Sequence, residues 1–340
     1  MKNNLLQHKN SQLKPLKAVY SYYFTEVREI VGLARNIDSD LFAVTGDGQK
    51  AQDSINEVMR FDVPLVIPKT GEGYVDLDRI HEPVIDRVVS AYSPLVKGLK
   101  EFENRYPTAG TSEGIYHYLT NLAVHKTTYI YVLEGEYEGY SEYARMLGLE
   151  VRVVKDFAEA ANLKEAGHWC ISNPSARDGN IIANQDIVEL AEIGHKIALD
   201  LAYVGATKPY EFDVSHPNVE AVFLSFSKPY GVFRFRIGFS FFRQPLESLY
   251  GTRWFKDIER VLTAAKLVEV LPPETLYEKY HSYQEKAIVM MNKQQGTQAQ
   301  PSDVLLLATS NRAPKEFVTY KRGDLYRFCL TPYFEAIEKS

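Results

Sequence analysis

Apolar and polar positions alternate with two different periods between residues 110 and 242, and this pattern predicts the fold. Apolar residues recur at helical spacing in 114–124, 140–147 and 186–193. Short runs rich in branched and aromatic residues predict strands at 128–132, 151–154, 169–172, 197–199, 221–225 and 237–242. Strands that alternate with helices indicate an α/β domain with a mostly parallel, helix-covered sheet.

The pattern changes after Pro245. Two long helices are expected at 246–270 and 274–293, and the second begins with prolines that suit a first helical turn. A polar break at 294–302 precedes strands expected at 304–308 and 325–330. We therefore predict three parts: an N-terminal segment, 1–60, that contributes to the small lobe; a large domain, 61–243; and a smaller α+β lobe, 244–340.

Length, composition and charge narrow the functional class. A chain of 340 residues with 45% apolar content can bury one large core and a smaller second one. The net charge of -5 and the scattered basic residues argue against binding to nucleic acid or to an anionic membrane. No stretch approaches the ~20 apolar residues of a membrane span, and the start has no run typical of a signal peptide, so we expect a cytoplasmic protein. Cys170 and Cys329 lie in apolar runs, which predicts buried thiols on strands and no metal site.

Residues 225–238 carry the strongest chemical signal, Ser-Phe-Ser-Lys-Pro-Tyr-Gly-Val-Phe-Arg-Phe-Arg-Ile-Gly. Lys228 follows an apolar strand, hydroxyl groups flank it, and Arg236 lies eight residues further on. An amine beside phosphate-binding groups suits an aldehyde that carries a phosphate. For Lys228 alone, a strand that leads into a basic turn is the simpler interpretation. The whole segment, however, resembles the lysine motif of the class I and II aminotransferases, which are fold-type I pyridoxal 5'-phosphate enzymes, and it fills every restricted position.

The resemblance implies a cofactor and a set of residues that hold it. The cofactor is pyridoxal 5'-phosphate, joined to Lys228 as a Schiff base, with Ser225 and Arg236 at its phosphate. Asp200, which follows the strand expected to end at residue 199 and precedes Lys228 by 28 residues, would keep the ring nitrogen protonated. Tyr203 would form a hydrogen bond with the phenolic oxygen. Alone, Asp200 and Tyr203 fit a turn at the end of a strand better than a cofactor site.

Two further segments resemble phosphate- and oxygen-binding loops of the family. Residues 109–115, Ala-Gly-Thr-Ser-Glu-Gly-Ile, resemble its phosphate cup, so Thr111 and Ser112 would bind phosphate at a helix N-terminus. A capping box that serves only the helix is the alternative. The family has an apolar strand before this cup, whereas 103–108 is polar here, so we expect a shortened connection. In 173–179, Asn173 would contact the phenolic oxygen and the substrate, although the loop lacks the family's second Asn-Pro and a surface turn remains possible.

Three aromatic and basic positions complete the resemblance. Tyr137, in Glu-Tyr-Glu-Gly-Tyr, matches an aromatic residue that stacks on the cofactor, although the family's proline is missing. Arg327 resembles the arginine of the C-terminal lobe that grips a substrate carboxylate with both guanidinium nitrogens, with a solvent-facing strand arginine as the alternative. Tyr92 lies where the family places a tyrosine that reaches the phosphate of the neighbouring subunit. The family also implies a homodimer.

The function implied by the resemblance is that of an aminotransferase, which moves an amino group between an amino acid and a 2-keto acid. Another pyridoxal-phosphate enzyme, such as a lyase, decarboxylase or cyclase of a specialised biosynthetic pathway, is the alternative, because the same residues support several reactions. A non-enzymatic, cofactor-binding relative is a third possibility. It fits the sequence less well, because Lys228, Asp200 and Arg236 are all present.

Overall fold

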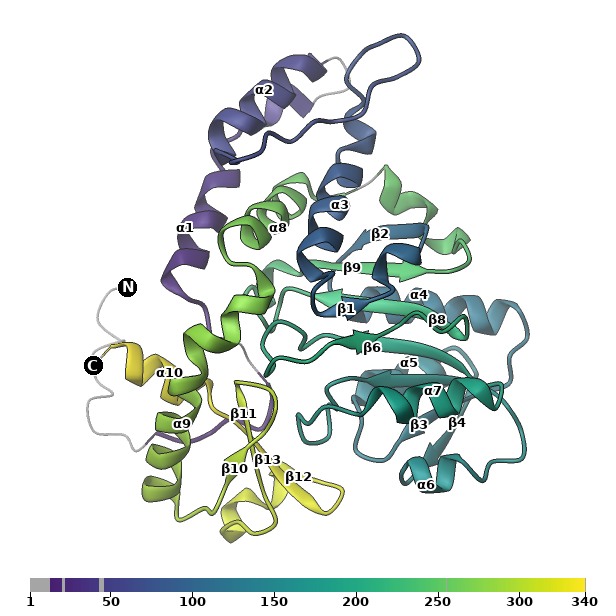
Figure 1. Cartoon of the computed structure of the whole chain (residues 1–340), viewed down its shortest axis with the longest axis vertical. Coiled ribbons are helices and arrows are strands. Elements are labelled where there is room, and N and C mark those ends of the chain that lie inside the picture. The colour runs from purple at the N-terminus through teal and green to yellow at the C-terminus, as the bar shows by residue number, and fades with distance from the viewer. Residues whose placement is uncertain (1–12, 20–21, 43–45, 255, 340) are drawn as a thin grey trace.

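The computed structural model describes residues 13–19, 22–42, 46–254 and 256–339. A seven-stranded sheet forms the centre of the larger part of the molecule (Figure 1). Its strand order is β2-β9-β8-β6-β5-β3-β4. Neighbouring strands run parallel from β8 to β4, whereas β9 runs antiparallel to both of its neighbours. The strands are β2 (Asn104–Thr108), β3 (Tyr129–Leu133), β4 (Glu150–Val154), β5 (His168–Ser172), β6 (Lys196–Leu201), β8 (Val219–Ser225) and β9 (Gly238–Phe242).

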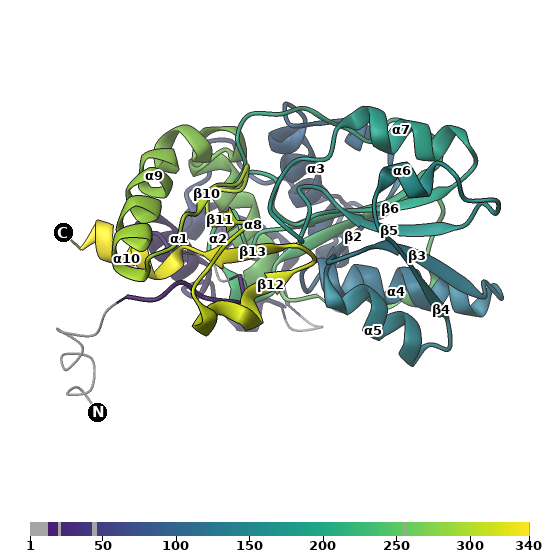
Figure 2. The same cartoon turned by 90° about the horizontal axis from the view of Figure 1, so that it is seen from below.

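Helices cover both faces of this sheet, as Figure 2 shows from below. One face is covered by α4 (Thr111–Val124) and α5 (Glu138–Met146), whose apolar residues share a core with alternate strand residues such as Ile130 and Val132. The other face packs against α7 (Asn184–Glu192) and α3 (His81–Tyr92). The expected α/β class, with a mostly parallel and helix-covered sheet, is therefore confirmed.

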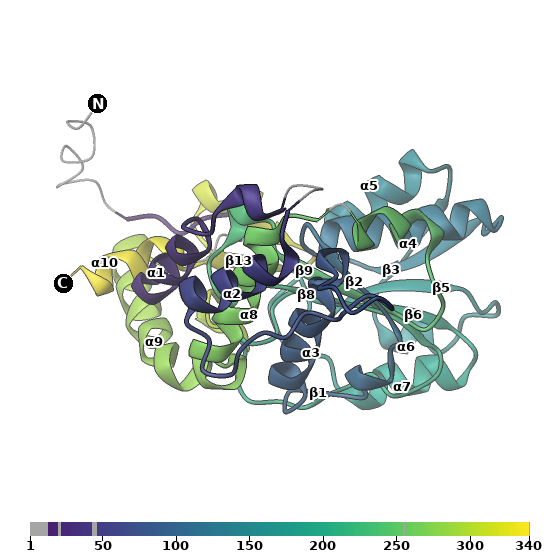
Figure 3. The ribbon, with the colours of Figure 1, turned by 90° about the horizontal axis from the view of Figure 1, so that it is seen from above.

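A four-stranded antiparallel sheet, in the order β10-β11-β13-β12, forms the second part. Beside it lie α9 (Leu276–Gln295) and α10 (Thr331–Glu338), which pack against each other. Figure 3 shows α1 (Thr25–Ala34) beside α8 (Ile258–Val270), and Leu16 pairs with Cys329, so described segments near the two ends of the chain lie together. The domain boundaries at residues 60 and 243 stay predictions. The strands are β10 (Gln300–Pro301), β11 (Leu307–Ser310), β12 (Lys321–Arg322) and β13 (Leu325–Cys329).

Short elements connect these parts. The remaining helices and strands are α2 (Gly48–Met59), α6 (Phe157–Ala160), β1 (Val96–Lys97) and β7 (Phe212–Asp213). The 3₁₀ helices are η1 (Ser39–Phe42), η2 (Leu77–Arg79), η3 (Leu99–Glu101), η4 (Phe233–Phe235), η5 (Glu247–Arg253), η6 (Pro273–Thr275) and η7 (Lys315–Tyr320). Cys170 and Cys329 are buried on β5 and β13, as predicted. Within the described residues, no helix is both long and apolar enough to cross a membrane.

Three expectations about local structure are wrong. The segment 246–270 is not one helix, because the Asp257 side chain accepts the Arg260 amide and starts α8 anew after η5. The strand expected at 304–308 begins only at Leu307. The polar segment before the phosphate cup is not shortened but forms β2, an edge strand of the large sheet that tolerates Pro107.

Candidate active site

A cavity of about 350 Å³ lies where the carboxyl ends of β5, β6 and β8 face the small sheet. Parallel strands end at one edge of a sheet, and in such folds ligands bind there. Nine of the ten predicted cofactor and substrate residues line this cavity. They are Thr111, Ser112, Tyr137, Asp200, Tyr203, Ser225, Lys228, Arg236 and Arg327. The tenth, Asn173, does not line it.

Lys228 follows the end of β8 and lies at the centre of this group. Its Nζ donates a hydrogen bond to the carbonyl of Val19 and lies 5.1 Å from the ring centre of Phe233. Burial lowers the pKa of Lys228 to about 8, and the positive charges of Arg327 and Arg236 act in the same direction. A lysine with this pKa exchanges protons near neutral pH.

Asp200 is the penultimate residue of β6, inside the strand and not after it, and its carboxyl group is buried. Tyr140 Oη donates to Asp200 Oδ2 at 2.9 Å, and the Ala202 amide donates to Oδ1 at 3.1 Å. Burial raises the pKa of Asp200 to about 6, although these hydrogen bonds, one from Thr111 and the charge of Lys228 lower it. The sequence analysis missed Tyr140, although its position three residues after Tyr137 was a usable signal.

Glu136 is a second buried carboxyl group that the sequence analysis did not select. It accepts hydrogen bonds from Ser172 Oγ and, at 3.2 Å, from Ser175 Oγ. The pKa of Glu136 is raised to about 7, mainly by burial and also by the negative charge of Asp200. The hydrogen bonds that Glu136 accepts lower its pKa and offset part of this rise. Glu136 lies behind the cavity wall and fixes the loop that follows β5.

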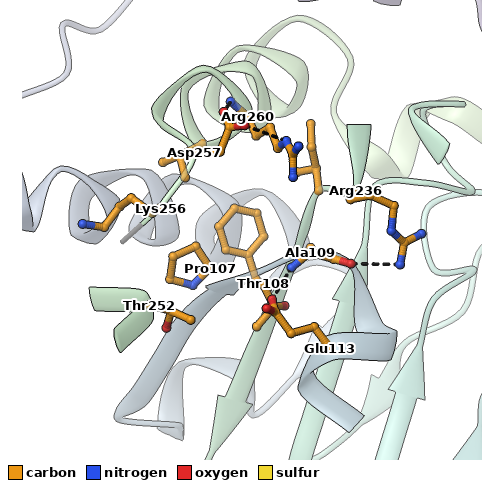
Figure 4. A pocket seen from close by; sticks show the side chains of 13 residues that line it. Pro107, Thr108, Ala109, Glu113, Arg236, Thr252, Lys256, Asp257 and Arg260 are labelled. Carbon is orange, nitrogen blue, oxygen red and sulfur yellow. Dashed lines mark hydrogen bonds and ion pairs between the residues drawn. The ribbon is translucent and has the colours of Figure 1, made fainter. Parts of the chain in front are cut away.

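The start of α4 and Arg236 also line the cavity. Gly110 is the N-cap of α4 with φ +82°, and a Cβ there would lie 2.8 Å from Arg236 Nη2. Figure 4 shows Arg236 reaching Ala109, whose carbonyl accepts from Nη2 at 2.9 Å. Glu113 accepts the Ala109 amide at 2.5 Å, so part of the alternative capping arrangement is present as well. Arg236 also borders a second cavity of about 170 Å³.

Arg327 is buried on β13. Its Nη1 donates to the carbonyl of Ala176 and its Nη2 to that of Lys17 at 3.5 Å, whereas its Nε has no hydrogen-bond partner within the described part of the chain. Among the described residues, no carboxylate forms an ion pair with Arg327. A buried guanidinium group without a counter-ion is costly, so this one favours an anionic ligand.

Two of the predicted residues lie outside the cavity. Asn173 is buried, and its side-chain amide bonds both backbone groups of Ile182, at 2.9 and 3.0 Å, so it holds its own loop instead of entering the cavity. Tyr92 is fully buried on α3 against Phe226 and does not line the cavity. The reason is helical spacing, because Tyr92 shares the buried face of α3 with Val84 and Val88.

Comparison with known proteins now identifies the family. The family model of class I and II aminotransferases matches residues 100–269, half of the chain. The chain belongs to this family. Its cofactor is pyridoxal 5'-phosphate, and the chain is a pyridoxal-phosphate-dependent enzyme of the aminotransferase fold. No curated protein sequence matches the chain.

Solved structures of distant proteins share the fold. An aminotransferase from Staphylococcus aureus has a TM-score of 0.62 and 12% identity, with 99% of this chain and 95% of that chain covered. The pyridoxal-phosphate-dependent cyclase OrfR has a TM-score of 0.60 and 16% identity over 96% and 91%. L-Threonine-O-3-phosphate decarboxylase from Porphyromonas gingivalis has a TM-score of 0.52 and 16% identity over 82% and 98%. These likenesses show the fold, and their different reactions leave this chain's reaction open.

The residues around the cavity fit the cofactor. Ser227 Oγ is buried without a hydrogen-bond partner within the described part of the chain, and Gly110 has no side chain to cap the first turn of α4. Both leave donors for a phosphate. A buried carboxylate, Asp200, and a lysine with a lowered pKa, Lys228, line the same cavity, which suits a cationic ring nitrogen and an aldehyde.

Proposed function

We propose that the chain is an aminotransferase that moves an amino group between an amino acid and a 2-keto acid, with pyridoxal 5'-phosphate bound to Lys228. The observation that carries this proposal is one cavity lined by Lys228, whose pKa is lowered, by the buried carboxylate of Asp200, and by the buried Arg327, which forms no ion pair with a described carboxylate. These are the groups that an amino acid and this cofactor need together.

Several residues would hold the cofactor. Thr111, Ser112, Ser225 and Arg236 would bind the phosphate, Tyr203 the phenolic oxygen, and the Tyr137 ring would lie against the cofactor ring. When bound, the cofactor supplies an aldehyde that condenses with amines and a ring that withdraws electrons from the substrate Cα. With a pKa of about 6, Asp200 is mostly ionised at neutral pH, and its carboxylate would keep the ring nitrogen of the cofactor protonated.

Lys228 would move the proton that defines the reaction. The neutral Lys228 amine would accept the proton from the substrate Cα as a general base and would hold it for return during the reaction. A pKa of about 8 makes the neutral fraction of Lys228 at neutral pH far larger than that of an ordinary lysine, and only the neutral amine can accept a proton. Burial therefore tunes Lys228 for this task.

Arg327 would decide between proton loss and loss of carbon dioxide. Its guanidinium group, whose Nε has no hydrogen-bond partner within the described residues, would hold the α-carboxylate by charge-assisted hydrogen bonds and so stabilise it as a carboxylate. Loss of carbon dioxide removes that charge and those bonds, so the arrangement favours transamination over decarboxylation. A lyase, decarboxylase or cyclase is the alternative proposal, because proteins with this fold include a decarboxylase and a cyclase.

A single-turnover experiment tests this proposal. Cofactor-loaded protein is mixed with individual amino acids, and the absorbance of the cofactor and the released products are followed. We expect at least one amino acid to give the aminated cofactor and one equivalent of its 2-keto acid. Carbon dioxide, an elimination product or a ring-closed product in place of the keto acid would instead assign the alternative. Lys228→Ala serves as the control without the reacting amine.

A further inference from the structure

A fourth cation, Arg322, lines the cavity together with Lys228, Arg236 and Arg327. Arg322 ends β12, and β12 pairs with β13, the strand that carries Arg327. Burial lowers the pKa of Arg327, and the positive charge of Arg322 lowers it further, so the two guanidinium groups feel each other's charge. Two cations on one wall of a partly enclosed cavity favour a ligand with two negative groups.

The partner of Arg322 in the protein is a weak one. Arg322 Nη2 lies 3.2 Å from Glu138 Oε1, at the start of α5. The Arg322 side chain is 18% exposed, whereas the Glu138 side chain is 75% exposed. Figure 2 shows the β12–β13 hairpin beside α5, and this ion pair joins β12 to the first residue of α5 at the edge of the cavity. A carboxylate that remains in solvent gains little from pairing, about 0–1 kcal/mol, so a ligand can displace it.

The other charged groups of the cavity do not account for Arg322. Among the described residues, the acidic side chains that line the cavity are Asp200 and Glu138. In the proposed function, the cofactor phosphate uses Arg236, the ring nitrogen uses Asp200, and the substrate α-carboxylate uses Arg327. The guanidinium group of Arg322 then faces the remaining volume, in which the substrate side chain must lie.

We propose that Arg322 binds a second anionic group, a carboxylate or a phosphate, on the side chain of the substrate, and that this group displaces Glu138. The proposal rests on the proposed function, because it assumes that Arg327 holds the α-carboxylate. The substrates are accordingly dicarboxylic or phosphorylated amino acids and keto acids. Glu138 occupies Arg322 whenever the substrate side chain is neutral.

Binding of three unreactive acids tests the proposal. Glutarate, 3-phosphonopropionate and butyrate each offer a carboxylate for Arg327, and the first two add a second carboxylate or a phosphonate. Isothermal titration calorimetry measures their affinities for the cofactor-loaded protein and for the protein without cofactor. We expect glutarate or 3-phosphonopropionate to bind at least about tenfold more tightly than butyrate, because a charged hydrogen-bonded pair is worth that much. The tighter of the two identifies the anion, and equal affinities for all three acids would overturn the proposal.

Matched variants separate Arg322 from general charge effects. Arg322→Gln removes the preference for the dianion and leaves butyrate binding unchanged. Lys321→Gln changes the net charge equally at the exposed neighbouring residue, which does not line the cavity, and leaves all three affinities unchanged. Equal losses in the two variants would refute a direct contact. Glu138→Gln leaves the arginine intact and is expected to tighten dianion binding severalfold; an unchanged affinity contradicts the displacement of Glu138.

The same preparation distinguishes a failure of this proposal from a failure of the proposed function. If amino acids yield keto acids but the dianions show no preference, the function stands and the role of Arg322 is refuted. If no amino acid yields a keto acid but the preference persists and depends on Arg322, the anion site stands and the proposed aminotransferase reaction is refuted.

Discussion

The hydrogen bond between Tyr140 and Asp200 has a consequence that can be measured as a function of pH. The change is Tyr140→Phe, which deletes one buried hydroxyl group and leaves the ring that packs in α5. This hydroxyl donates to Asp200 Oδ2 at 2.9 Å. A hydrogen bond to a charged group contributes about 1.5–3 kcal/mol. Since 1.36 kcal/mol corresponds to one pH unit, its loss raises the pKa of Asp200, now about 6, by about one to two pH units.

The sign of the effect follows from the charge of Asp200. Only the ionised carboxylate stabilises a protonated ring nitrogen, so cofactor affinity falls when the pH drops through the pKa of Asp200. In the parent protein this loss begins near pH 6, and in Tyr140→Phe it begins at a higher pH, between about 7 and 8. At still higher pH the two proteins bind the cofactor about equally well.

The assay is a titration of each protein with pyridoxal 5'-phosphate from pH 5 to pH 9, followed by absorbance. Titrations of the cofactor itself occur in both proteins and cancel in the comparison. Tyr129→Phe is the control, because its hydroxyl donates to the neutral carbonyl of Ala166 at 3.1 Å, away from the cavity. Affinity profiles of the parent and Tyr140→Phe that coincide over the whole range would refute the reasoning.

Three further predictions concern single residues. Glu136→Gln raises the free energy of unfolding by about 2–3 kcal/mol at pH 8 and by less at pH 5. The pKa of Glu136 lies at about 7 in the folded protein and at 4.5 ordinarily, so ionisation of Glu136 lowers the stability of the parent protein as the pH rises between these values. Thermal melts of the cofactor-free protein at both pH values measure this difference, and an equal gain at both would contradict it. Arg327→Lys weakens binding of the reacting amino acid about ten- to one-hundredfold in single-turnover titrations and leaves cofactor affinity unchanged, because lysine cannot form a bidentate contact with a carboxylate. Unchanged substrate affinity would show that Arg327 does not hold the carboxylate. Gly110→Ala lowers cofactor affinity at least about tenfold, because the added Cβ would contact Arg236. Gly148→Ala is the control and leaves the affinity unchanged, because Gly148 has a similar φ of +79° but no atom within 4 Å of an added Cβ. Equal effects of the two substitutions in cofactor titrations would exclude the contact.

The sequence predicts most of the large sheet because its strands and helices have clear hydrophobic periods. The predicted strands end near Ser172, Asp200 and Ser225, and parallel strands bring their carboxyl ends to one edge. Most candidate residues therefore line one cavity. The break in 246–270 depends on the Asp257 side-chain cap, which a helical period alone does not reveal.

Other parts of the site depend on tertiary contacts that a local pattern cannot encode. Arg322 lies in a two-residue strand, and Val19 lies in an irregular segment, so neither has a period that assigns it to the cavity. Glu136 appears in the sequence as an ordinary loop residue, and its burial follows from the packing of the loop after β5. Tyr92 could have been predicted as a core residue from its spacing to Val84 and Val88, but the resemblance pointed elsewhere.

The central claim is that Lys228 binds pyridoxal 5'-phosphate covalently. The most direct measurement is to load the protein with the cofactor, reduce it with borohydride, digest it and determine the masses of the peptides. The account predicts one added cofactor, on the peptide that contains Lys228, and none in Lys228→Ala. An unmodified Lys228 peptide, or a cofactor attached mainly to other lysines, would contradict it.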